Sequence, residues 1–284
     1  MGGVIWLASY PKSGNTWVRS FLATYFRNPE QPLDINQLYT FAYGDGFLTV
    51  YEHVSGMSRE EMTPEIIRQL RPQVHRWMGG NPNQTVFCKT HSGLGNEGGV
   101  PLITPDATAG AIYVIRNPLD LAVSLAHHMQ CGYGRAVEIM GTRDKIIGGD
   151  PNEHLPGTVG AWHQNVQGWL KAEGLTRHVM RYEDMHNKPG PTFRALVRFL
   201  GLPVEVQRLR KAIRFTSFNE LSKQEARQGF IEARPDGAVS FFRRGRVGQW
   251  REVLTDAQVA QLIEEQGKPM RENGYLDKRG NPVF

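Results

Sequence analysis

The sequence predicts a three-layer α/β/α domain with a central parallel sheet of about five strands. Short runs of β-branched and aromatic residues alternate with amphipathic helical patterns along the chain. In addition, a glycine-containing loop, "SYPKSGNT" at residues 9–16, stands between the first strand pattern and the first helix pattern. With 284 residues the chain can bury a large core, and we expect a single domain over residues 1–284.

Four short runs are predicted to be buried strands: residues 4–9, 85–90, 111–116 and 178–182. One helix is expected over residues 17–25 and another over residues 118–129. Three further helices are indicated by apolar stripes or end signals: Val159/Trp162/Val166/Trp169, residues 193–200 with Gly201 as the stop, and Thr255-x-x-Gln258 with Gly267 at the far end.

The composition is that of an ordinary globular protein. Hydrophobic residues make up 40% and charged residues 21% of the chain, and no stretch is long enough to span a bilayer. Two cysteines, Cys88 and Cys131, are too few for a disulfide framework. We therefore expect a reducing, cytoplasmic location and no stable membrane insertion.

The formal net charge of +5 indicates anionic partners, without distinguishing a nucleic acid from a small polyanion. The basic residues are scattered apart from one dense cluster at residues 241–251. A cluster this short is typical of a solvated face, so we expect no nucleic-acid partner.

Polar and cationic residues follow each predicted strand. They are Lys12, then Lys89-Thr90-His91, then Arg116-Asn117-Pro118, then Tyr182-Glu183-Asp184. In parallel sheets, ligands bind beyond the carboxyl ends of the strands. The sequence therefore predicts an anion site at one edge of the sheet.

The loop at residues 9–16 is similar to a Walker A loop whose lysine has moved. On the frame G-x-x-x-x-G-K-[ST], Gly14 and Thr16 fall at their expected positions. Asn15 occupies the lysine position, Ser9 replaces the first glycine, and the lysine lies earlier, at Lys12. We expect a fold of the P-loop type with altered phosphate chemistry.

A strand, "YPKSGNTW" and a helix together resemble the 5′-phosphosulfate loop of sulfotransferases that use 3′-phosphoadenosine 5′-phosphosulfate (PAPS). Further segments resemble this family in order: "CKTH" at 88–91, "VIRNPLDLAVS" at 114–124, "RYEDM" at 181–185, "FTSFNEL" at 215–221 and "FFRRGRVGQW" at 241–250. The resemblance covers about residues 4 to 252, and six ordered motifs argue against coincidence.

Two positions depart from the family pattern. Arg244 replaces the usual lysine and keeps the charge, whereas Gln249 replaces an acid, which puts a local structural contact in question. Residues 28–84 and 129–158 match no motif, and we expect these segments to determine the acceptor.

The resemblance implies a catalytic set of Lys12, Lys89, His91 and Ser124. Lys12 would assist the oxygen that bridges phosphorus and sulfur, where charge builds as the bond breaks. Because a sulfuryl group bears only one negative charge, no metal is required. His91 would be the general base for the acceptor hydroxyl. Lys89 would stabilise the sulfuryl group, and Ser124 would contact Lys12.

The resemblance also implies which residues bind PAPS and its product 3′-phosphoadenosine 5′-phosphate (PAP). Trp17 and Phe218 would sandwich the adenine, and arginines would clamp the 3′-phosphate through paired hydrogen bonds. Core packing is the alternative for the aromatic residues, and a surface ion pair is the alternative for Arg116. The full set is Lys12, Ser13, Gly14, Asn15, Thr16, Trp17, Arg116, Ser124, Tyr182, Thr216, Phe218, Phe241, Phe242, Arg243, Arg244 and Gly245.

The favoured function is sulfuryl transfer from PAPS to an acceptor hydroxyl. A nucleotide kinase or other NTPase lacks support because the Walker lysine is missing, although Glu183-Asp184 could hold Mg²⁺. A non-enzymatic module that binds adenine nucleotides or nucleic acid would have no use for Lys12 together with His91.

Three questions stay open at the level of sequence. The acceptor could be a phenol, an alcohol, a sugar, a peptide side chain or an amine. A homo-oligomer is compatible with the sequence, which does not fix the oligomeric state. The aromatic-rich stretch at 39–53 could wall an acceptor pocket or be a packed excursion.

Overall fold

A computed structural model of the chain describes residues 2–81, 83–147, 155–233 and 240–283. It divides into two compact units. Unit 1 comprises residues 1–10, 42–113 and 142–179, and unit 2 comprises residues 11–41, 114–141 and 180–284. The segments 28–84 and 129–158, expected to determine the acceptor, include residues 82 and 148–154, which lie outside the described residues.

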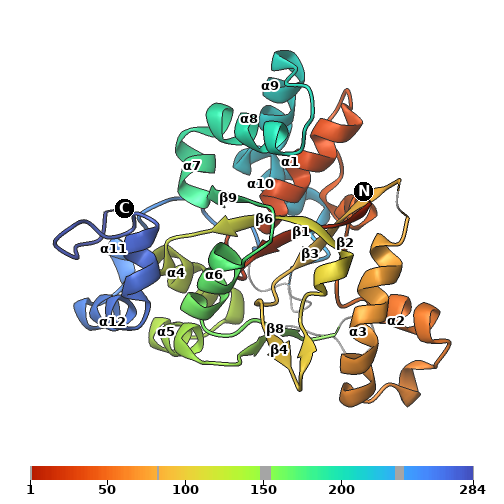
Figure 1. Ribbon diagram of the computed structural model, residues 1–284. Coiled ribbons are helices and arrows are strands. Elements are labelled where there is room, and N and C mark those ends of the chain that lie inside the picture. The colour runs from red at the N-terminus through yellow and green to blue at the C-terminus, as the bar shows by residue number, and fades with distance from the viewer. Residues whose placement is uncertain (1, 82, 148–154, 234–239, 284) are drawn as a thin grey trace. The chain divides into compact units, whose positions relative to one another are not determined.

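Unit 1 contains a five-stranded sheet in the order β2-β3-β1-β6-β9 (Figure 1). The strands are β1 (Gly3–Ser9), β2 (Ala42–Gly44), β3 (Thr85–Thr90), β6 (Thr108–Ile115) and β9 (Arg177–Arg181); β6 and β9 end in unit 2. β3 lies parallel to both β1 and β2. The α/β class with a central parallel sheet of five strands is therefore confirmed.

The four strands named from the sequence are all present, and the fifth, β2, lies in the stretch at 39–53. β2 has three residues and pairs with Phe87 to Lys89 of β3. Strand β6 begins at Thr108, earlier than its predicted start at residue 111. This is because its polar and small first residues lack the apolar character on which the prediction rested.

Helices and short hairpins complete unit 1. The helices are α2 (Leu48–Ser55), α3 (Pro64–Gly79) and α6 (Trp162–Lys171), with 3₁₀ turns η2 (Arg59–Glu61) and η3 (Pro105–Ala107). α3 packs against β1 and β3. The hairpins pair β4 (Asn96–Glu97) with β5 (Val100–Pro101) and β7 (Ile146–Ile147) with β8 (Gly157–Thr158).

The apolar stripe Val159/Trp162/Val166/Trp169 was predicted to be helical, and this prediction is wrong for Val159. Gly160 adopts a φ of +71°, which ends any helical run, and α6 begins at Trp162. Val159 donates its backbone N–H to the Lys145 carbonyl instead. Trp162, Val166 and Trp169 are buried on α6, as the spacing predicts.

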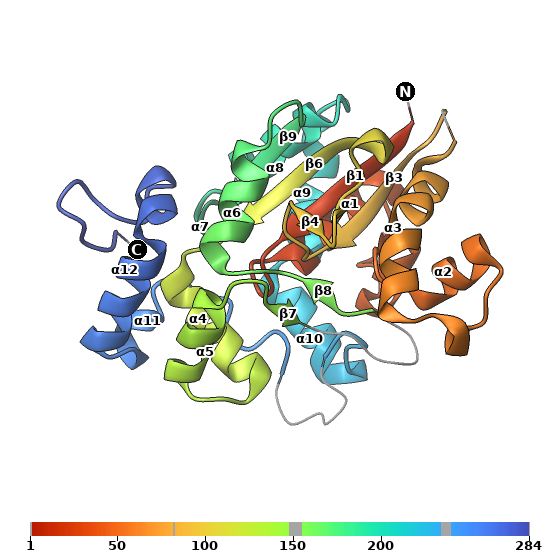
Figure 2. The same cartoon turned by 60° about the horizontal axis from the view of Figure 1, so that its bottom comes forward.

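Unit 2 is mainly helical. It contains α1 (Asn15–Arg27), η1 (Ile35–Thr40), α4 (Pro118–Met129), α5 (Tyr133–Gly141), α7 (Tyr182–Asn187), α8 (Pro189–Phe199), α9 (Val206–Phe215), α10 (Phe218–Gln228), α11 (Trp250–Val253) and α12 (Asp256–Glu272). α1 packs on α9, and Phe21 of α1 stacks on Phe193 of α8 at 4.1 Å. α4, α5, α11 and α12 form a second group of packed helices (Figure 2).

Helix α12 begins with the predicted capping box of Thr255 and Gln258. The predicted stop at Gly267 is wrong, because α12 continues to Glu272 through Pro269. Gln266 and Met270 are fully buried on this last part of the helix. Burial therefore outweighs the local preference of glycine and proline to end a helix.

Buried carboxylates hold the backbone of unit 2 in place. Asp120 accepts hydrogen bonds from the backbone N–H groups of Gly248 (2.6 Å) and Trp250 (3.1 Å). Glu183 accepts from the Asn117 N–H (2.9 Å) and the Tyr275 hydroxyl (3.0 Å). These contacts fix the start of α4 and the segment that leads into α11. Among the described residues, no helix is long and apolar enough to cross a membrane.

Candidate active site

The loop between β1 and α1 has a backbone that few residues can adopt. Gly14 has a φ of +105°, and a Cβ on it would lie 2.9 Å from Tyr182 Cδ2 and 3.0 Å from Met185 Cε. Lys12 also has a positive φ, +67°, which is uncommon for a residue other than glycine. The loop leads into the first turn of α1, which contains no acidic residue. The N–H groups of such a turn favour an anion.

Several polar atoms around this loop are buried. Ser13 is fully buried, and its hydroxyl has no hydrogen-bond partner among the described residues. Trp17 Nε1 and Arg116 Nε are also buried and have no hydrogen-bond partner within the described part of the chain. A buried donor without a partner costs about 1–3 kcal/mol. These donors are suited to a polar ligand at the loop.

Arg116 links the loop to the C-terminal segment of unit 2. Its guanidinium donates to the carbonyls of Lys12 (3.0 Å) and Arg246 (3.5 Å), and its Cζ lies 4.1 Å from the centre of the Tyr182 ring. Arg116 is only 5% exposed. It is therefore not the surface ion pair that was the alternative from the sequence.

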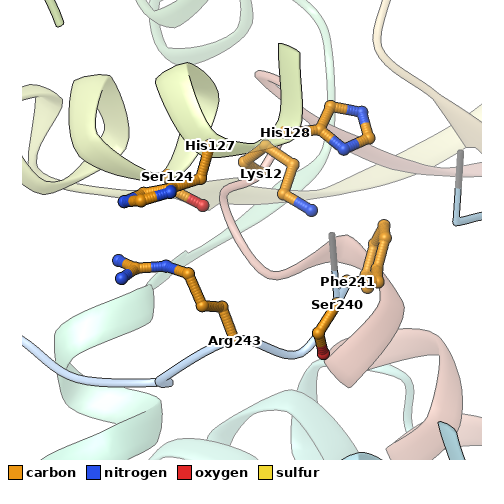
Figure 3. Close-up of a pocket in the computed structure, with 7 residues that line it drawn as sticks. All are labelled: Lys12, Ser124, His127, His128, Ser240, Phe241 and Arg243. Carbon is orange, nitrogen blue, oxygen red and sulfur yellow. The ribbon is translucent and has the colours of Figure 1, made fainter. Parts of the chain in front are cut away.

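A pocket in unit 2 brings predicted and unpredicted residues together (Figure 3). Lys12, Ser124, Phe241 and Arg243, all singled out from the sequence, line it with Ser240, His127 and His128. The last three were missed. A signal was present for the two histidines, since residues 124, 127 and 128 share one face of α4. Burial and the nearby Arg243 and Arg244 lower the pKa of His127, which favours its neutral form.

Trp17 and Phe218, which were assigned to the adenine, and Phe241 belong to one cluster in unit 2. Trp17, Phe218 and Phe241 are partly buried against a core of Ile35, Leu221, Phe230 and Phe242. Gly245 has a φ of +59°, and a Cβ on it would collide with the Phe218 ring.

Thr216 and Tyr182 are buried at the ends of two helices. Thr216 donates its hydroxyl to the Ala212 carbonyl (2.8 Å) at the end of α9. Tyr182 begins α7, and its ring meets Trp17 edge-on at 5.9 Å. The structure thus brings Trp17 and Tyr182 into contact.

Gln249, which stands where the family pattern has an acid, still makes structural contacts within the segment at 243–249. Gln249 Oε1 accepts from the Arg243 guanidinium at 2.7 Å, and Gln249 Nε2 donates to the Arg246 carbonyl at 2.9 Å. A neutral amide therefore orients Arg243 without cancelling its charge. Arg244 is exposed and pairs with Glu252 at 3.4 Å.

His91 and Lys89 lie in unit 1, at the end of β3. The ring Nδ1 of His91 lies 2.8 Å from the Ser9 carbonyl oxygen and 3.3 Å from Ser9 Oγ. A carbonyl oxygen only accepts, so Nδ1 carries the proton. In the neutral ring, Nε2 is then the nitrogen with the basic lone pair. The carbonyl of His91 accepts from Asn165 Nδ2 at 3.1 Å, which fixes its backbone.

Asp45 supports the same turn and was not predicted. Thr90 Oγ1 donates to Asp45 Oδ2 at 2.5 Å and accepts from the Ser92 N–H at 3.0 Å. Burial raises the pKa of Asp45, while Thr90 and the charge of Lys89 oppose that shift. This network holds the residues on both sides of His91.

Glu183, which could have held Mg²⁺ in an NTPase, has another role. It is fully buried, and both carboxylate oxygens accept the structural hydrogen bonds described above. Burial raises the pKa of Glu183. Over the described residues, no group of three or more histidine, cysteine or acidic side chains is arranged to hold a metal.

These features define a P-loop-type α/β protein with a cationic, phosphate-suited loop and a histidine at a neighbouring strand end. The chain matches the sulfotransferase domain family over residues 3–274. It therefore belongs to that family and is a PAPS-dependent sulfotransferase, as the sequence motifs predict.

Similar proteins come from animals and plants. Sulfotransferase 1A1 of Canis lupus familiaris is 24% identical over 278 residues, which cover 93% of this chain and 82% of that protein. Flavonol 3-sulfotransferase of Flaveria bidentis is 23% identical over 273 residues, which cover 91% and 78%.

Two solved structures share the fold. Mouse sulfotransferase SULT7A1, complexed with PAP, has a TM-score of 0.60 and 20% identity, covering 98% of this chain and 87% of that one. Retinol dehydratase, in a complex with retinol and PAP, has a TM-score of 0.64 and 17% identity, covering 95% and 81%.

The contact between Gly245 and Phe218 gives a stability prediction. Gly245→Ala should lower the free energy of unfolding by about 2–4 kcal/mol, because backbone strain adds to a clash with the ring. Gly201→Ala is the control, since Gly201 has a φ of +69° and open space around it. That variant should lose only about 1–2 kcal/mol in denaturant unfolding. Equal losses would show that the Phe218 ring does not restrict position 245.

Proposed function

We propose that this enzyme transfers a sulfuryl group from PAPS to an acceptor hydroxyl, with His91 as general base and without a metal. The observation that carries the proposal is the hydrogen bond from His91 Nδ1 to the Ser9 carbonyl. It selects the tautomer in which Nε2 can accept a proton. We further propose that residues 1–284 act as one sulfotransferase domain, in line with the family match over residues 3–274.

The loop residues fit the 5′ end of PAPS, which supplies the sulfuryl group when bound. Ser13 would donate its buried hydroxyl to the 5′-phosphate, together with the first N–H groups of α1. Lys12 would bring a positive charge to the bridging oxygen. Gly14 and Asn15 to Trp17 complete this part of the site.

Cationic residues of unit 2 would hold the 3′-phosphate. Arg116 is buried and has Nε without a partner among the described residues. Ser124 and Arg243 line the pocket that also contains Lys12. Arg244 and the Gly245 N–H would complete the clamp, while Trp17, Phe218, Phe242, Tyr182 and Thr216 would surround the adenine.

His91 would take the proton from the acceptor hydroxyl on Nε2. The Ser9 carbonyl would then face an imidazolium whose Nδ1–H it already accepts, which favours the charged ring and keeps its orientation. Lys89 would stabilise the sulfuryl group as it transfers.

A transfer assay tests the reaction and the absence of metal together. With ³⁵S-labelled PAPS and a panel of phenols and alcohols, we expect labelled product and PAP at equal rates with and without EDTA. The reason is that Lys12 supplies the charge that Mg²⁺ supplies in kinases. An activity that disappears with EDTA and returns only with Mg²⁺ would contradict the proposal.

Removing the proposed base gives a second test. His91→Ala should lower the transfer rate by about 10²–10⁴-fold and leave PAP affinity unchanged. Phenols with more acidic hydroxyls should lose less, because they need less help to lose the proton. The measurement is the rate across phenols of graded acidity.

His186→Ala is the matched control for this experiment, because His186 is an exposed histidine at the end of α7. It should keep the rate of the unmodified enzyme. If the penalty of His91→Ala stays the same across all phenols, His91 is not the base.

A further inference from the structure

The Lys12 side chain has an aromatic partner in Phe241. Its ammonium nitrogen lies 3.5 Å from the centre of the Phe241 ring, and both residues line the pocket of unit 2 (Figure 3). An ammonium group over the face of an aromatic ring is attracted by the negative charge of that face. The Lys12 backbone is held as well, because its carbonyl accepts from Arg116 at 3.0 Å.

The Phe241 ring is itself held in place by packing. It meets the Phe230 ring edge-on at 4.9 Å and the His128 ring at 6.2 Å. Its neighbour Phe242 is buried in the aromatic cluster of unit 2. The ring below Lys12 is therefore part of a packed surface.

One carboxylate fixes the backbone of the same segment. Glu225 of α10 accepts from the Phe241 N–H (2.5 Å), the Phe242 N–H (2.8 Å) and the Ser240 hydroxyl (2.8 Å). Hydrogen bonds to a charged acceptor are stronger than those between neutral groups. Glu225 thus ties three consecutive residues to α10.

We propose that Phe241 is a positioning residue that holds the Lys12 ammonium group in the ligand-free enzyme, and that Glu225 keeps Phe241 in place. The inference rests on the proposed function of Lys12. A cation–π contact favours the held position by about 3- to 30-fold. A charged hydrogen bond from Lys12 to the co-substrate would favour the position of Lys12 at the ligand by about 10- to 150-fold. The anionic co-substrate therefore draws Lys12 from the ring when it binds.

The test is the rate at which an amine-reactive reagent modifies Lys12, followed by peptide mass spectrometry without any nucleotide. Phe241→Leu should raise this rate by about 3- to 30-fold, because the ring no longer attracts and covers the ammonium group. Phe241→Trp should keep the rate of the unmodified enzyme or lower it. Phe21→Leu, which alters the packing of α1 against α8 without touching Phe241, is the control for altered packing and should change the rate by less than about twofold.

Glu225→Gln keeps one acceptor and loses the second carboxylate oxygen. It should also raise the rate of Lys12 modification, but by less than Phe241→Leu does. The double variant should equal Phe241→Leu, since Glu225 acts through the ring. Equal rates in Phe241→Leu and the unmodified enzyme would overturn the proposal, as would Phe241→Trp behaving like Phe241→Leu.

Adding PAP separates this inference from the proposed function. PAP should protect Lys12 in the unmodified enzyme, in Phe241→Trp and in Phe241→Leu, because its 5′-phosphate competes for the lysine. If Phe241→Leu raises the rate but PAP gives no protection, Phe241 holds Lys12 and the assigned nucleotide site is wrong. If PAP protects but Phe241→Leu has no effect, the nucleotide site stands and the positioning role is wrong.

Discussion

The parallel pairing of β1 with β3 runs in register from Gly3 opposite Thr85 to Ala8 opposite Thr90. The next residues along the two strands are Ser9 and His91, and the Ser9 carbonyl accepts the hydrogen bond from His91 Nδ1. A slip of one residue would turn every side chain of the strand to the other face of the sheet. The register therefore determines the tautomer of the histidine and the point where the loop to Lys12 begins. The proposed proton transfer to His91 therefore depends on the register of the sheet.

Acidic and cationic residues have separate roles in unit 2. Asp120, Glu183 and Glu225 accept hydrogen bonds from backbone N–H groups, which fix the segments that carry the proposed anion-binding residues. Arg116 contacts carbonyl groups, and Arg243 contacts the neutral amide of Gln249. The carboxylates therefore stabilise the backbone, whereas Arg116 and Arg243 are oriented by neutral groups.

The sequence predicted the parts of the fold that local patterns specify. The strand at 85–90 and the helix at 118–129 have the bounds expected, because each has a clear apolar pattern. β2 was not recognised, since three residues give no periodicity. Gly267 did not end α12, because its burial with Met270 depends on residues distant in sequence. Asp45 and Glu225 act through contacts with residues 45 and about 16 positions away, and such pairing leaves no pattern in one sequence. The fold and the family were predictable, while the residues that hold the site in place needed the structure.

The proposed nucleotide site depends on Arg116, which would bind the 3′-phosphate. Calorimetric titration of the unmodified enzyme and of Arg116→Ala, each with PAP and with adenosine 5′-phosphosulfate, tests this most directly. Only PAP has the 3′-phosphate, so Arg116→Ala should weaken PAP by roughly 1.5–3 kcal/mol, or about 10- to 150-fold. Adenosine 5′-phosphosulfate should bind both proteins with similar affinity. Equal losses for the two ligands would contradict the claim and would mean that Arg116 only supports the loop through the Lys12 carbonyl.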